Sequence, residues 1–582
     1  MEKVNIKIDG IDVAVPKDKT VLQAARSMGI NIPTLCYLEG INKTGACRMC
    51  LVEIDGDKKL HTACTLAVWD GMVVKTNTKR VRDARRMNLR LILANHHCDC
   101  LSCSRSKNCE LQDMCSDLGL SDEYLKALPK EKLQPVDALS PSIVRDPNKC
   151  ILCGRCVAAC KDVQKIEILL FANRGLETSV EPAFGDSFKD TPCIYCGQCI
   201  NVCPVAALRE KSEIEKVWEA LENKDLHVVV QEAPAVRAAL GEEFGLPMGT
   251  PVTGKMYTAL RMLGFDKVFD TNFGADLTIM EEGTELLHRI KEGGKLPMIT
   301  SCSPGWIRYI EHYYPDLLEH LSTCKSPQQM TGAVLKSYYP EIEGLDPKKV
   351  FVVSVMPCTS KKFEAAKEEM LNGHGTRDVD AVLTTRELAK MIREASIDFA
   401  SLSDGKGDDI FSDYTGAGVI FGATGGVMEA AIRTVADIVS GQELEEIEYH
   451  AVRGLDGIKE ASIQIGDMTV KVAVAHGTEN AQKLMDLIRE GKADYHFIEV
   501  MACPGGCVAG GGQPHVHSSQ MVKINVRYER AKALYTEDSG NAKRKSHHNP
   551  SVQRLYKEYL GEPCGHKSHE LLHTHYSART LY

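Results

Sequence analysis

The sequence predicts a multidomain protein of the α+β and α/β classes. Its 582 residues exceed what one hydrophobic core usually holds, because single cores stop growing at about 300 residues. Most of its 23 cysteines stand in short groups with ligand spacing, which indicates metal binding rather than a disulfide scaffold. From residue 211 onward, β-rich runs such as HVVVQEA and KVFVVSVMPC alternate with helical patterns. That alternation predicts an α/β region with largely parallel, buried strands.

Residues 1–80 are expected to form a small α+β domain that binds a [2Fe–2S] cluster. The runs VNIKI and IDVAV, joined by Asp9 and Gly10, predict a hairpin, and Thr20 opens a predicted helix. Four cysteines follow in the order of a plant-type ferredoxin, CxxxxCxxC…C, but the first gap has ten residues rather than four. A zinc site or disulfides are the alternative. The predicted ligands are Cys36, Cys47, Cys50 and Cys64.

Residues 81–120 combine a helical pattern at 81–97 with the spacing His-x3-Cys-x2-Cys-x5-Cys. This spacing resembles that of the His-ligated [4Fe–4S] module of hydrogenases and respiratory NADH dehydrogenases, and a neutral imidazole in place of an anionic thiolate should raise the reduction potential of such a cluster. His97 fits the spacing as well, and a purely structural histidine is the alternative. Cys98 and Cys115 have no predicted role. The predicted ligands are His96, Cys100, Cys103 and Cys109.

The segment 121–140 is charged and interrupted by prolines, so we expect a linker before a domain at 141–210. That domain repeats the bacterial ferredoxin pattern CxxCxxCxxxC twice, and in such runs the fourth cysteine ligates the other cluster. A zinc ribbon also uses CxxC pairs, but it does not explain the triplets. One [4Fe–4S] cluster is therefore assigned to Cys150, Cys153, Cys156 and Cys203, and the other to Cys160, Cys193, Cys196 and Cys199.

Three segments of the region 211–582 carry a resemblance to a known family. They read TSCSPGW at 300–306, MPCTSKKFE at 356–364 and EVMACPGGCVAGGGQP at 499–514. They are similar to the signature segments of [FeFe]-hydrogenases, and the chain follows that family's modular order from end to end. The resemblance implies a two-lobed α/β hydrogenase domain that holds an H-cluster, a [4Fe–4S] unit joined through one thiolate to a two-iron centre with CO, cyanide and dithiolate ligands.

By the same resemblance, Cys358, Cys503 and Cys507 are cubane ligands, and Cys507 is the bridge to the two-iron centre. Independently of it, each of these cysteines ends or follows a β-rich run, which places it at the carboxyl edge of the strands, where α/β proteins keep their sites. The glycines of GGCVAGGG would let backbone approach a bulky cofactor closely. Three unrelated buried thiols are the alternative.

One position departs from the family pattern. The first segment usually reads TSCCP, whereas this chain has Cys302 followed by Ser303. The resemblance makes Cys302 a proton relay and puts Ser303 where the fourth cubane thiolate is expected. Either the serine oxygen ligates, or Cys302 shifts to become the ligand, or the cubane keeps an open site; the residues leave all three open.

The resemblance also implies a proton path and a cofactor pocket. The positions that match the path are Glu282, Glu285, Arg289, Ser322 and Cys302. Acidic pairs three apart on a helix are more often solvated surface, which is the alternative. Lys361 matches a lysine that holds a cyanide ligand, since a buried ammonium needs an anionic acceptor. Ala235 stands where a serine is often found. The matched pocket positions are Pro234, Gln328, Met356 and Met501.

These features predict a catalytic subunit that interconverts H2 with protons and electrons, with one [2Fe–2S], three [4Fe–4S] and one H-cluster. No Gly-x-Gly-x-x-Gly follows a strand, and GAGVIFG at 416–422 has one residue too many. Flavin and NAD(P) are therefore expected on partner subunits, with ferredoxin as the other candidate partner. The rival interpretations are an electron-wire subunit of a dehydrogenase and a hydrogenase-like sensory or assembly protein.

Composition excludes two further classes of partner. The net charge of −9 gives no basic footprint for nucleic acid. The N-terminus lacks a signal-peptide pattern, and no apolar run approaches the roughly 18 residues that span a bilayer, so we expect a cytoplasmic protein without membrane contact. The basic, His-rich stretch from KRKSHH to HTHYSART is expected to be a solvated terminus. Cys324 and Cys564 have no predicted role.

Overall fold

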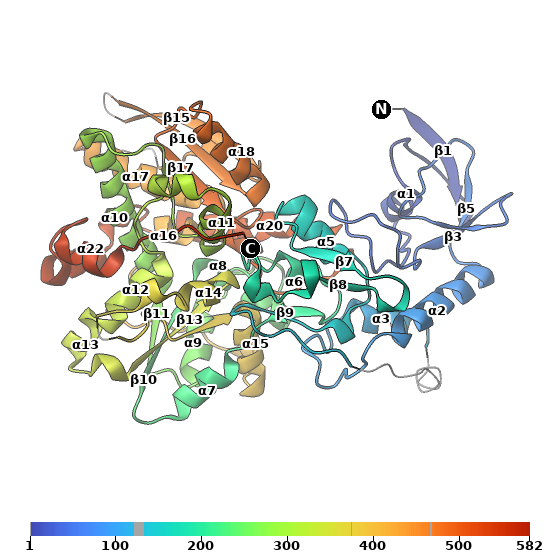
Figure 1. The fold of residues 1–582 in the computed structure, drawn as a ribbon, viewed down its shortest axis with the longest axis horizontal. Coiled ribbons are helices and arrows are strands. Elements are labelled where there is room, and N and C mark those ends of the chain that lie inside the picture. The colour runs from blue at the N-terminus through green and yellow to red at the C-terminus, as the bar shows by residue number, and fades with distance from the viewer. Residues whose placement is uncertain are drawn as a thin grey trace.

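The chain was analysed as a computed structural model that describes residues 2–120, 133–373, 375–443, 445, 447–465 and 468–581. The molecule is elongated, with the N-terminal modules at one end and the large C-terminal region at the other (Figure 1). We call residues 2–210 the relay half and residues 211–581 the catalytic half. Most of the expected linker, 121–132, lies outside the described residues.

The first domain of the relay half is built around a mixed five-stranded sheet. Strands β1 (Lys3–Ile8) and β2 (Ile11–Pro16) form the predicted hairpin, which is confirmed. The sheet has the order β2-β1-β5-β3-β4, with β3 at Leu51–Ile54, β4 at Leu60–Thr62 and β5 at Val73–Lys75. Helix α1 (Val21–Ser27) begins after Thr20, whose side chain and that of Gln23 form a capping box.

Helices α2 (Lys79–Ala94) and α3 (Glu110–Asp117) frame the His/Cys segment and lead to the ferredoxin-type module. The described end of the linker, residues 133–140, packs on that module. There the backbone of Asp137 pairs with that of Arg145, and the Asp137 carboxylate accepts a hydrogen bond of 2.7 Å from the Ser187 hydroxyl.

The ferredoxin-type module consists of two small strand pairs and two short helices. Strand β6 (Ile143–Arg145) pairs with β9 (Leu208–Glu210), and β7 (Leu169–Ala172) pairs with β8 (Ser179–Pro182). Helices α5 (Arg155–Ala158) and α6 (Gln198–Val202) each begin after a glycine with a left-handed backbone, Gly154 at φ 76° and Gly197 at φ 69°. A side chain there would be strained, so these glycines allow the sharp turn between the cysteines of each run.

The catalytic half contains two sheets whose strands are largely parallel and buried, as the sequence predicts. The first has the order β11 (Lys267–Asp270), β10 (His227–Glu232), β13 (Val350–Met356), β14 (Ala381–Thr384), and all its pairings are parallel. The second has the order β12 (Met298–Ile299), β17 (Phe497–Met501), β16 (Met468–His476), β15 (Ile458–Ile465), with only β15 antiparallel.

Helices cover both sheets and fill the space between the two lobes. Helix α10 (Thr271–Glu292) contacts α12 (Pro327–Lys336), α16 (Gly416–Ile420) and α17 (Gly426–Ser440). The remaining longer helices are α7 (Ile214–Glu222), α9 (Thr253–Met262), α11 (Pro304–Tyr313), α15 (Thr385–Glu394), α18 (Thr478–Arg489) and α20 (Val526–Gly540). Within the described residues, no helix combines the length and apolar character needed to cross a bilayer.

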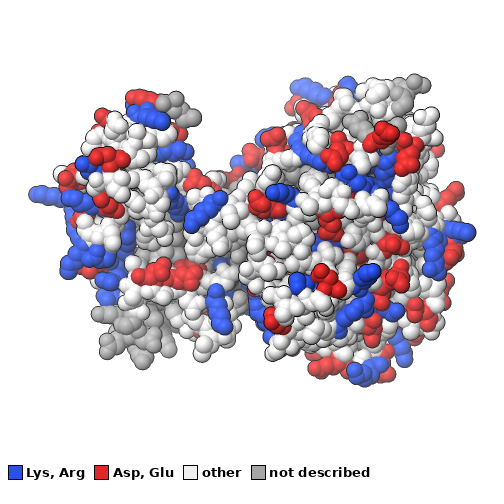
Figure 2. All heavy atoms as spheres, turned by 180° about the vertical axis from the view of Figure 1, so that it is seen from behind, with Lys and Arg blue, Asp and Glu red and all other residues white. Residues whose placement is uncertain are grey.

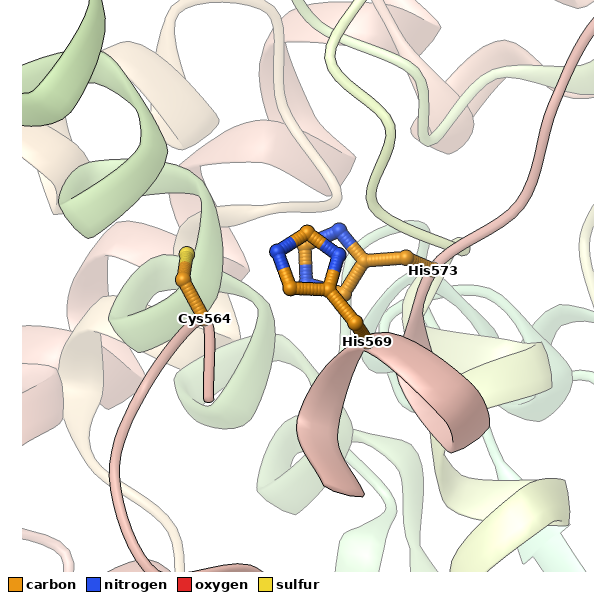
Figure 3. A group of neighbouring side chains, drawn as sticks. All are labelled: Cys564, His569 and His573. Carbon is orange, nitrogen blue, oxygen red and sulfur yellow. The ribbon is translucent and has the colours of Figure 1, made fainter. Parts of the chain in front are cut away.

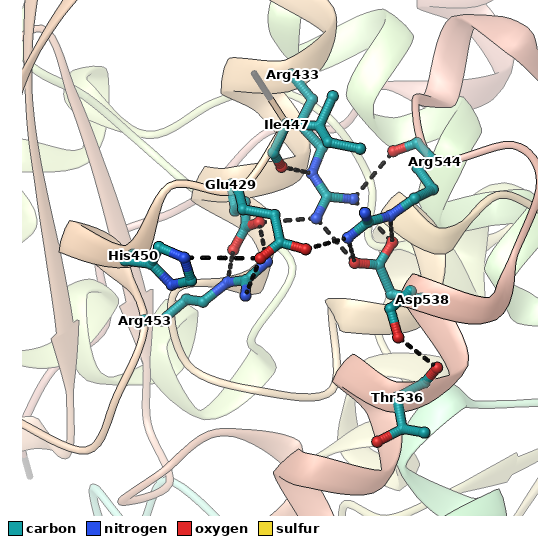
Figure 4. Close-up of polar contacts among 10 residues, drawn as sticks. Glu429, Arg433, Ile447, His450, Arg453, Thr536, Asp538 and Arg544 are labelled. Atoms are coloured by element: carbon teal, nitrogen blue, oxygen red, sulfur yellow. Dashed lines mark hydrogen bonds and ion pairs between the residues drawn. The ribbon is translucent and has the colours of Figure 1, made fainter. Parts of the chain in front are cut away.

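The prediction of a solvated C-terminal stretch is wrong. Beyond α20 the chain forms α21 (Pro550–Leu555) and α22 (His566–Leu572), which pack on the catalytic half. Figure 4 shows charged side chains of this region paired with one another rather than facing solvent. Arg433 on α17 pairs with Asp538 on α20 at 2.9 Å, and Arg544 donates to the same carboxylate at 2.6 Å. Buried acidic partners therefore hold these cations in the interior.

The outer surface carries both signs of charge. Figure 2 shows Lys and Arg interspersed with Asp and Glu over the face that it presents. That face has no extended basic patch of the kind that follows a nucleic-acid backbone.

Candidate active site and metal centres

Four cysteines of the first domain converge in the loops around β3 and β4. Cys36, Cys50 and Cys64 are buried, and Cys47 is half-buried. The Cys36 amide donates to the Cys47 sulfur at 3.4 Å, and the thiols of Cys36 and Cys50 both interact directly with that of Cys64. All four predicted ligands of this domain therefore meet in one place, in a set of sulfur donors that suits a small iron–sulfur cluster.

The two adjacent histidines of the His/Cys segment lie in different environments. The Nδ1 of His96 donates to the Lys149 carbonyl at 3.1 Å, so that Nε2 is left for a metal. Burial lowers the pKa of His96, which favours the neutral, metal-binding imidazole. The side chain of His97 is exposed.

The cysteines of this segment are also grouped. Cys109 lies within electrostatic range of Cys103, and the two cysteines without a predicted role, Cys98 and Cys115, both lie near Cys100 and Cys109. The structure therefore gathers more thiols here than the ligand spacing requires.

The two ferredoxin runs exchange their fourth cysteines in space. One cavity of about 450 Å³ is lined by Cys150, Cys153, Cys156 and Cys203. The charged groups that act most strongly on Cys199 are Cys196, Cys193 and Cys160. The four cysteines of the second set therefore also lie close together. The structure therefore brings together the cysteines that the spacing groups in each set.

Two buried contacts join the modules around these sets. The Asn42 side-chain amide donates to the Cys36 carbonyl at 2.9 Å and to the Cys153 carbonyl at 3.0 Å, and so ties the first cysteine loop to a ferredoxin loop. Arg155 donates to Glu110 of the His/Cys segment at 2.9 Å and to the Tyr37 carbonyl at 3.3 Å.

Glu110 also contacts the catalytic half. The Ser518 hydroxyl donates to Glu110 at 2.8 Å. One buried ion pair therefore contacts all four modules. It could not be found from sequence, because Arg155 and Glu110 carry no motif of their own.

A cavity of about 820 Å³ lies where the carboxyl ends of strands from both sheets face each other. The loops that follow β10, β12, β13 and β17 line this cavity, and Cys196 of the ferredoxin module also lines it. Each predicted pocket position and each cysteine of the three signature segments is on this wall: Pro234, Gln328, Met356, Met501, Cys302, Cys358, Cys503 and Cys507, with Ser303, Ala235 and Lys361.

The walls of this cavity suit a bulky metal cofactor. A Cβ at Gly510 would lie 2.2 Å from the Pro357 carbonyl oxygen, and one at Gly506 would lie 2.7 Å from the Thr424 amide. Only glycine permits such close backbone approach. Burial raises the pKa of Cys507 to about 12 and also raises those of Cys358 and Cys503. Three buried thiols become thiolates here only with a cation to stabilise them, so the donor set fits a metal cluster.

Cys302 and Ser303 face different neighbours. The electrostatic neighbours of Cys302 include Glu282, Lys361 and Cys507. Ser303 Oγ accepts a hydrogen bond of 3.3 Å from the amide of Ala502, directly before Cys503. The thiol therefore lies toward the acidic residues of α10, whereas the serine lies beside the cysteine loop.

The predicted proton-path residues form a connected series at its outer end. Arg289 donates to Glu285 at 2.6 Å, and Ser322 donates to the other oxygen of Glu285 at 2.8 Å. The side chain of Glu285 is only 12% exposed and Glu282 is only 1% exposed, so the solvated-surface alternative is wrong for this acidic pair.

Glu282 is the innermost carboxyl of the series and is only 1% exposed. Burial, together with the charge of Glu285, raises the pKa of Glu282 to about 8. Neither of its oxygens forms a hydrogen bond of ordinary geometry with a described residue, although Ser322 lies close enough to influence its pKa. A carboxyl that takes up and releases a proton near neutral pH suits proton transfer.

Lys361 has an acidic partner that the sequence prediction did not include. Its ammonium donates to Glu364 at 2.9 Å and to the Cys302 carbonyl at 3.2 Å. Gln328 donates to the same carboxylate oxygen at 3.0 Å. The Lys–Glu spacing of three residues within SKKFE was the available signal, since such pairs meet on one helical face.

Clustered buried thiols that lead to a glycine-walled cavity define the class of iron–sulfur oxidoreductases. Comparisons with known proteins then give the family. Residues 226–511 match the iron-only hydrogenase large subunit, C-terminal domain, and residues 524–579 match the iron hydrogenase small subunit. In the relay half, residues 1–79 match a 2Fe-2S iron–sulfur cluster binding domain. Residues 85–123 match the NADH-ubiquinone oxidoreductase-G iron–sulfur binding region, and 140–209 match the ferredoxin-like domain of NADH-quinone oxidoreductase subunit 3.

Individual relatives agree with these matches. The chain is 48% identical to the NADP-reducing hydrogenase subunit HndD of Solidesulfovibrio fructosivorans over 590 residues, covering 100% of both chains. It is 48% identical to iron hydrogenase 1 of Clostridium pasteurianum, covering 98% of this chain and 99% of the relative. An apo [FeFe]-hydrogenase structure from Chlamydomonas reinhardtii is 44% identical with a TM-score of 0.56, covering 63% of this chain and 99% of that chain.

The chain therefore belongs to the iron-only, or [FeFe], hydrogenases, as one of their catalytic subunits. The prediction of a hydrogenase is confirmed. The rival interpretation of an electron-wire subunit is wrong, because such a subunit has no hydrogenase domain.

Proposed function

We propose that this subunit binds one [2Fe–2S], three [4Fe–4S] and one H-cluster. The observation that carries the proposal is the 820 Å³ cavity, on whose wall Cys358, Cys503 and Cys507 meet. The proposed relay ligands are Cys36, Cys47, Cys50 and Cys64; His96, Cys100, Cys103 and Cys109; Cys150, Cys153, Cys156 and Cys203; and Cys160, Cys193, Cys196 and Cys199. When bound, the H-cluster supplies the redox chemistry that forms and splits H2.

The chain's own contribution to turnover is the movement of protons. We assign the order Arg289, Glu285, Ser322, Glu282 and Cys302, from the outer surface to the cavity. Arg289 orients Glu285, and Ser322 lies between the two carboxyls. Glu282 holds a proton at neutral pH because its pKa is raised to about 8, and Cys302 exchanges that proton with the cavity.

Cys302 is better placed as the relay than as a cubane ligand. Among charged groups, Glu282, the innermost carboxyl of the proposed path, acts most strongly on the Cys302 thiol, so this thiol adjoins the path. We therefore assign the fourth cubane position to Ser303, whose hydroxyl lies beside the loop of Cys503. Lys361 and Gln328 are assigned to orienting the cofactor, with Glu364 fixing both side chains.

The relay half offers two surfaces to redox partners. The Cys36 loop and the His96 segment both adjoin the Cys150 set, the first through Asn42 and the second through Lys149. Cys196 carries the series to the wall of the cavity. Two entry points suit a subunit that exchanges electrons with more than one partner.

We assign the partners to flavin- and NAD(P)-binding hydrogenase subunits, with ferredoxin as an additional or alternative partner. The relative in Solidesulfovibrio fructosivorans is a subunit of an NADP-reducing hydrogenase, and its likeness extends over the whole chain. The segment 416–422, the nearest to a dinucleotide pattern, contributes instead to helix α16 against α10.

The test is H2 uptake and evolution with an artificial redox dye, on anaerobically produced protein loaded by the maturation enzymes. Infrared spectra in the CO and cyanide stretching region are recorded on the same sample. Activity together with those bands supports the proposal and shows that Ser303 is compatible with turnover. Intact relay clusters with neither activity nor bands would favour a sensory or assembly role.

A further inference from the structure

The C-terminal segment brings three metal-binding side chains together outside the catalytic cavity. Cys564, His569 and His573 each present a ligand atom, and these atoms all lie within 4.8 Å of one another. Figure 3 shows the two imidazoles lying against each other with the Cys564 sulfur on the facing side. Cys564 has no role predicted from sequence, and the proposed function uses none of the three.

Local structure accounts for this geometry. His569 lies on helix α22 and His573 directly follows that helix, four residues further on, which is the spacing that puts two side chains on one face. Their ring centroids are 4.1 Å apart. Cys564 lies in the turn before α22, where the backbone has φ 55° and the amide donates to the Glu281 carboxylate at 2.7 Å.

Two neighbours, the buried Glu281 and the half-buried Thr323, hold His573 in position from both sides. Its Nε2 lies 3.1 Å from Oε2 of Glu281, the oxygen to which the Cys564 amide donates, so Nε2 faces Cys564. Its Nδ1 shares a hydrogen bond of 2.7 Å with the Thr323 hydroxyl. A second hydrogen bond of this kind fixes the ring orientation of metal-binding histidines, and the buried Glu281 carboxylate offsets the charge of a cation.

We propose that Cys564, His569 and His573 bind one divalent ion of the zinc class. One thiolate and two imidazoles are donors that Zn²⁺ prefers, and three protein ligands leave a fourth position for water. His569 is exposed, so an ion reaches the site from solvent. Binding forms one metal–sulfur and two metal–nitrogen bonds and releases the Cys564 thiol proton to solvent, while the His573 proton moves from Nε2 to Nδ1, which then donates to the Thr323 hydroxyl.

A second group of possible ligands in the catalytic half differs from this site, because one of its ligands is already paired with a cation. Asp437, His547 and His548 also lie within 4.8 Å of one another. There, however, the Lys545 ammonium donates to Asp437 at 2.6 Å, so a cation already occupies the acidic ligand. The described neighbours of Cys564 and His569 place no ammonium or guanidinium on these ligands.

The site adjoins the outer end of the proposed proton path, and this part of the inference rests on the proposed function. The Thr323 amide donates to Glu285 at 3.2 Å, and Thr323 shares its hydroxyl with His573. His573, Glu285 and Cys324 also present ligand atoms within 4.8 Å of one another. An ion on His573 adds positive charge beside Glu285, which opposes the arrival of a proton at this end of the path, so zinc slows proton exchange there.

The experiment measures zinc binding to the full-length, iron-loaded protein and to two variants, Cys564→Ser and His569→Ala. His566→Ala is the matched control, because His566 is also exposed and begins the same helix. We expect the wild type and the control to retain one more zinc ion per chain than the variants after gel filtration. In titrations each variant should bind at least about 10-fold more weakly. Zinc X-ray absorption should show one sulfur at about 2.3 Å and nitrogens at about 2.0 Å.

Equal zinc content in the wild type and both variants, or the absence of a sulfur neighbour, overturns the site, whatever the hydrogenase activity. The coupling has a separate readout. Added zinc should lower H2 turnover several-fold in the wild type and the control but not in Cys564→Ser. Zinc binding without that difference overturns the coupling, and loss of activity in zinc-free wild type points instead to the proposed function.

Discussion

The relay half and the catalytic half hold their thiols in opposite ways. In the relay half, a single loop and the short helix α5 present Cys150, Cys153 and Cys156 within seven residues. In the catalytic half, Cys302, Cys358 and Cys507 follow strands of two different sheets and are separated by up to about 200 residues. The relay sites therefore take most of their ligands from short runs within one module, whereas the cavity exists only where the two sheets meet.

Both halves pair buried charge, as in Arg155 with Glu110 at 2.8 Å in the relay half and Arg433 with Asp538 at 2.9 Å in the catalytic half. The catalytic half also holds Glu282 buried without an ion-pair partner among the described residues, and the pKa of Glu282 rises to about 8. Paired charge joins modules, whereas an unpaired carboxyl is kept ready to exchange a proton.

The largest effect is expected from removing Cys302, the thiol proposed to pass protons to the cavity. Cys302→Ala should reduce H2 turnover by about 1,000-fold, because the last proton donor before the cavity is lost. The relay clusters should keep their spectra, since Cys302 belongs to none of their ligand sets. Turnover is measured with a redox dye and cluster content by electron paramagnetic resonance. The variant Cys98→Ala controls for the loss of a thiol, and loss of the cubane signal in Cys302→Ala would make Cys302 a ligand instead.

A smaller loss is expected when the inner carboxyl is replaced. Glu282→Gln should reduce turnover by about 100-fold at pH 7, because the amide cannot exchange a proton. The control Glu292→Gln removes an exposed carboxylate at the end of the same helix and should have little effect.

The same variant tests the raised pKa through stability. Glu282 is neutral in the folded protein up to about pH 8 but ionises near pH 4.5 when unfolded, so the folded state binds more protons between these values. Its contribution to stability therefore falls as pH rises from about 4.5 to 8, by up to about 1.4 kcal/mol per pH unit. Glu282→Gln should flatten the decline of Tm across this window. An unchanged pH profile of Tm would contradict the assigned pKa.

The join between the halves is tested by removing one member of its ion pair. Arg155→Met leaves Glu110 buried and unpaired, and should destabilise the folded protein by about 3 kcal/mol. Lys75→Met is the matched control, because the pair of Lys75 and Asp55 is exposed and screened by water, so its loss should have little effect on stability. Thermal unfolding is followed together with the iron content of each variant. Equal effects of the two substitutions would mean that the buried pair does not join the modules.

If His96 rather than His97 is the cluster ligand, replacing His96 should change the reduction potential of one cluster without unfolding the protein. His96→Cys should lower the potential of one relay cluster by on the order of 100 mV, because an anionic thiolate replaces a neutral imidazole. His97→Cys should leave all potentials unchanged. Redox titration of the cluster signals separates the two variants, and the reverse result would assign the ligand to His97.

The smallest effect is expected at the serine that departs from the family pattern. Ser303→Cys should shift the cubane potential downward by on the order of tens of millivolts and alter its resonance spectrum, with turnover nearly retained. An unaltered spectrum would remove Ser303 from the ligand set.

Much of the relay half could be predicted from sequence because its signals are local. The hairpin of β1 and β2, the helix after Thr20 and the cysteine runs all depend on residues within a few positions of one another. The parallel, buried strands of the catalytic half were equally predictable from their apolar runs. The identity of the cavity needed the resemblance, because cysteines far apart in the chain carry no spacing signal.

What the tertiary structure alone decided depends on long-range packing. Sequence could not show that Glu282 is buried, that Cys302 faces it, or that Ser303 lies beside the loop of Cys503. Nor could composition show that the charged C-terminal stretch packs against the catalytic half and brings Cys564 to His573. Local patterns determine which groups are present and which elements they form. Burial and the neighbours of a charge set its pKa and its partners, and these arise only when distant segments pack together.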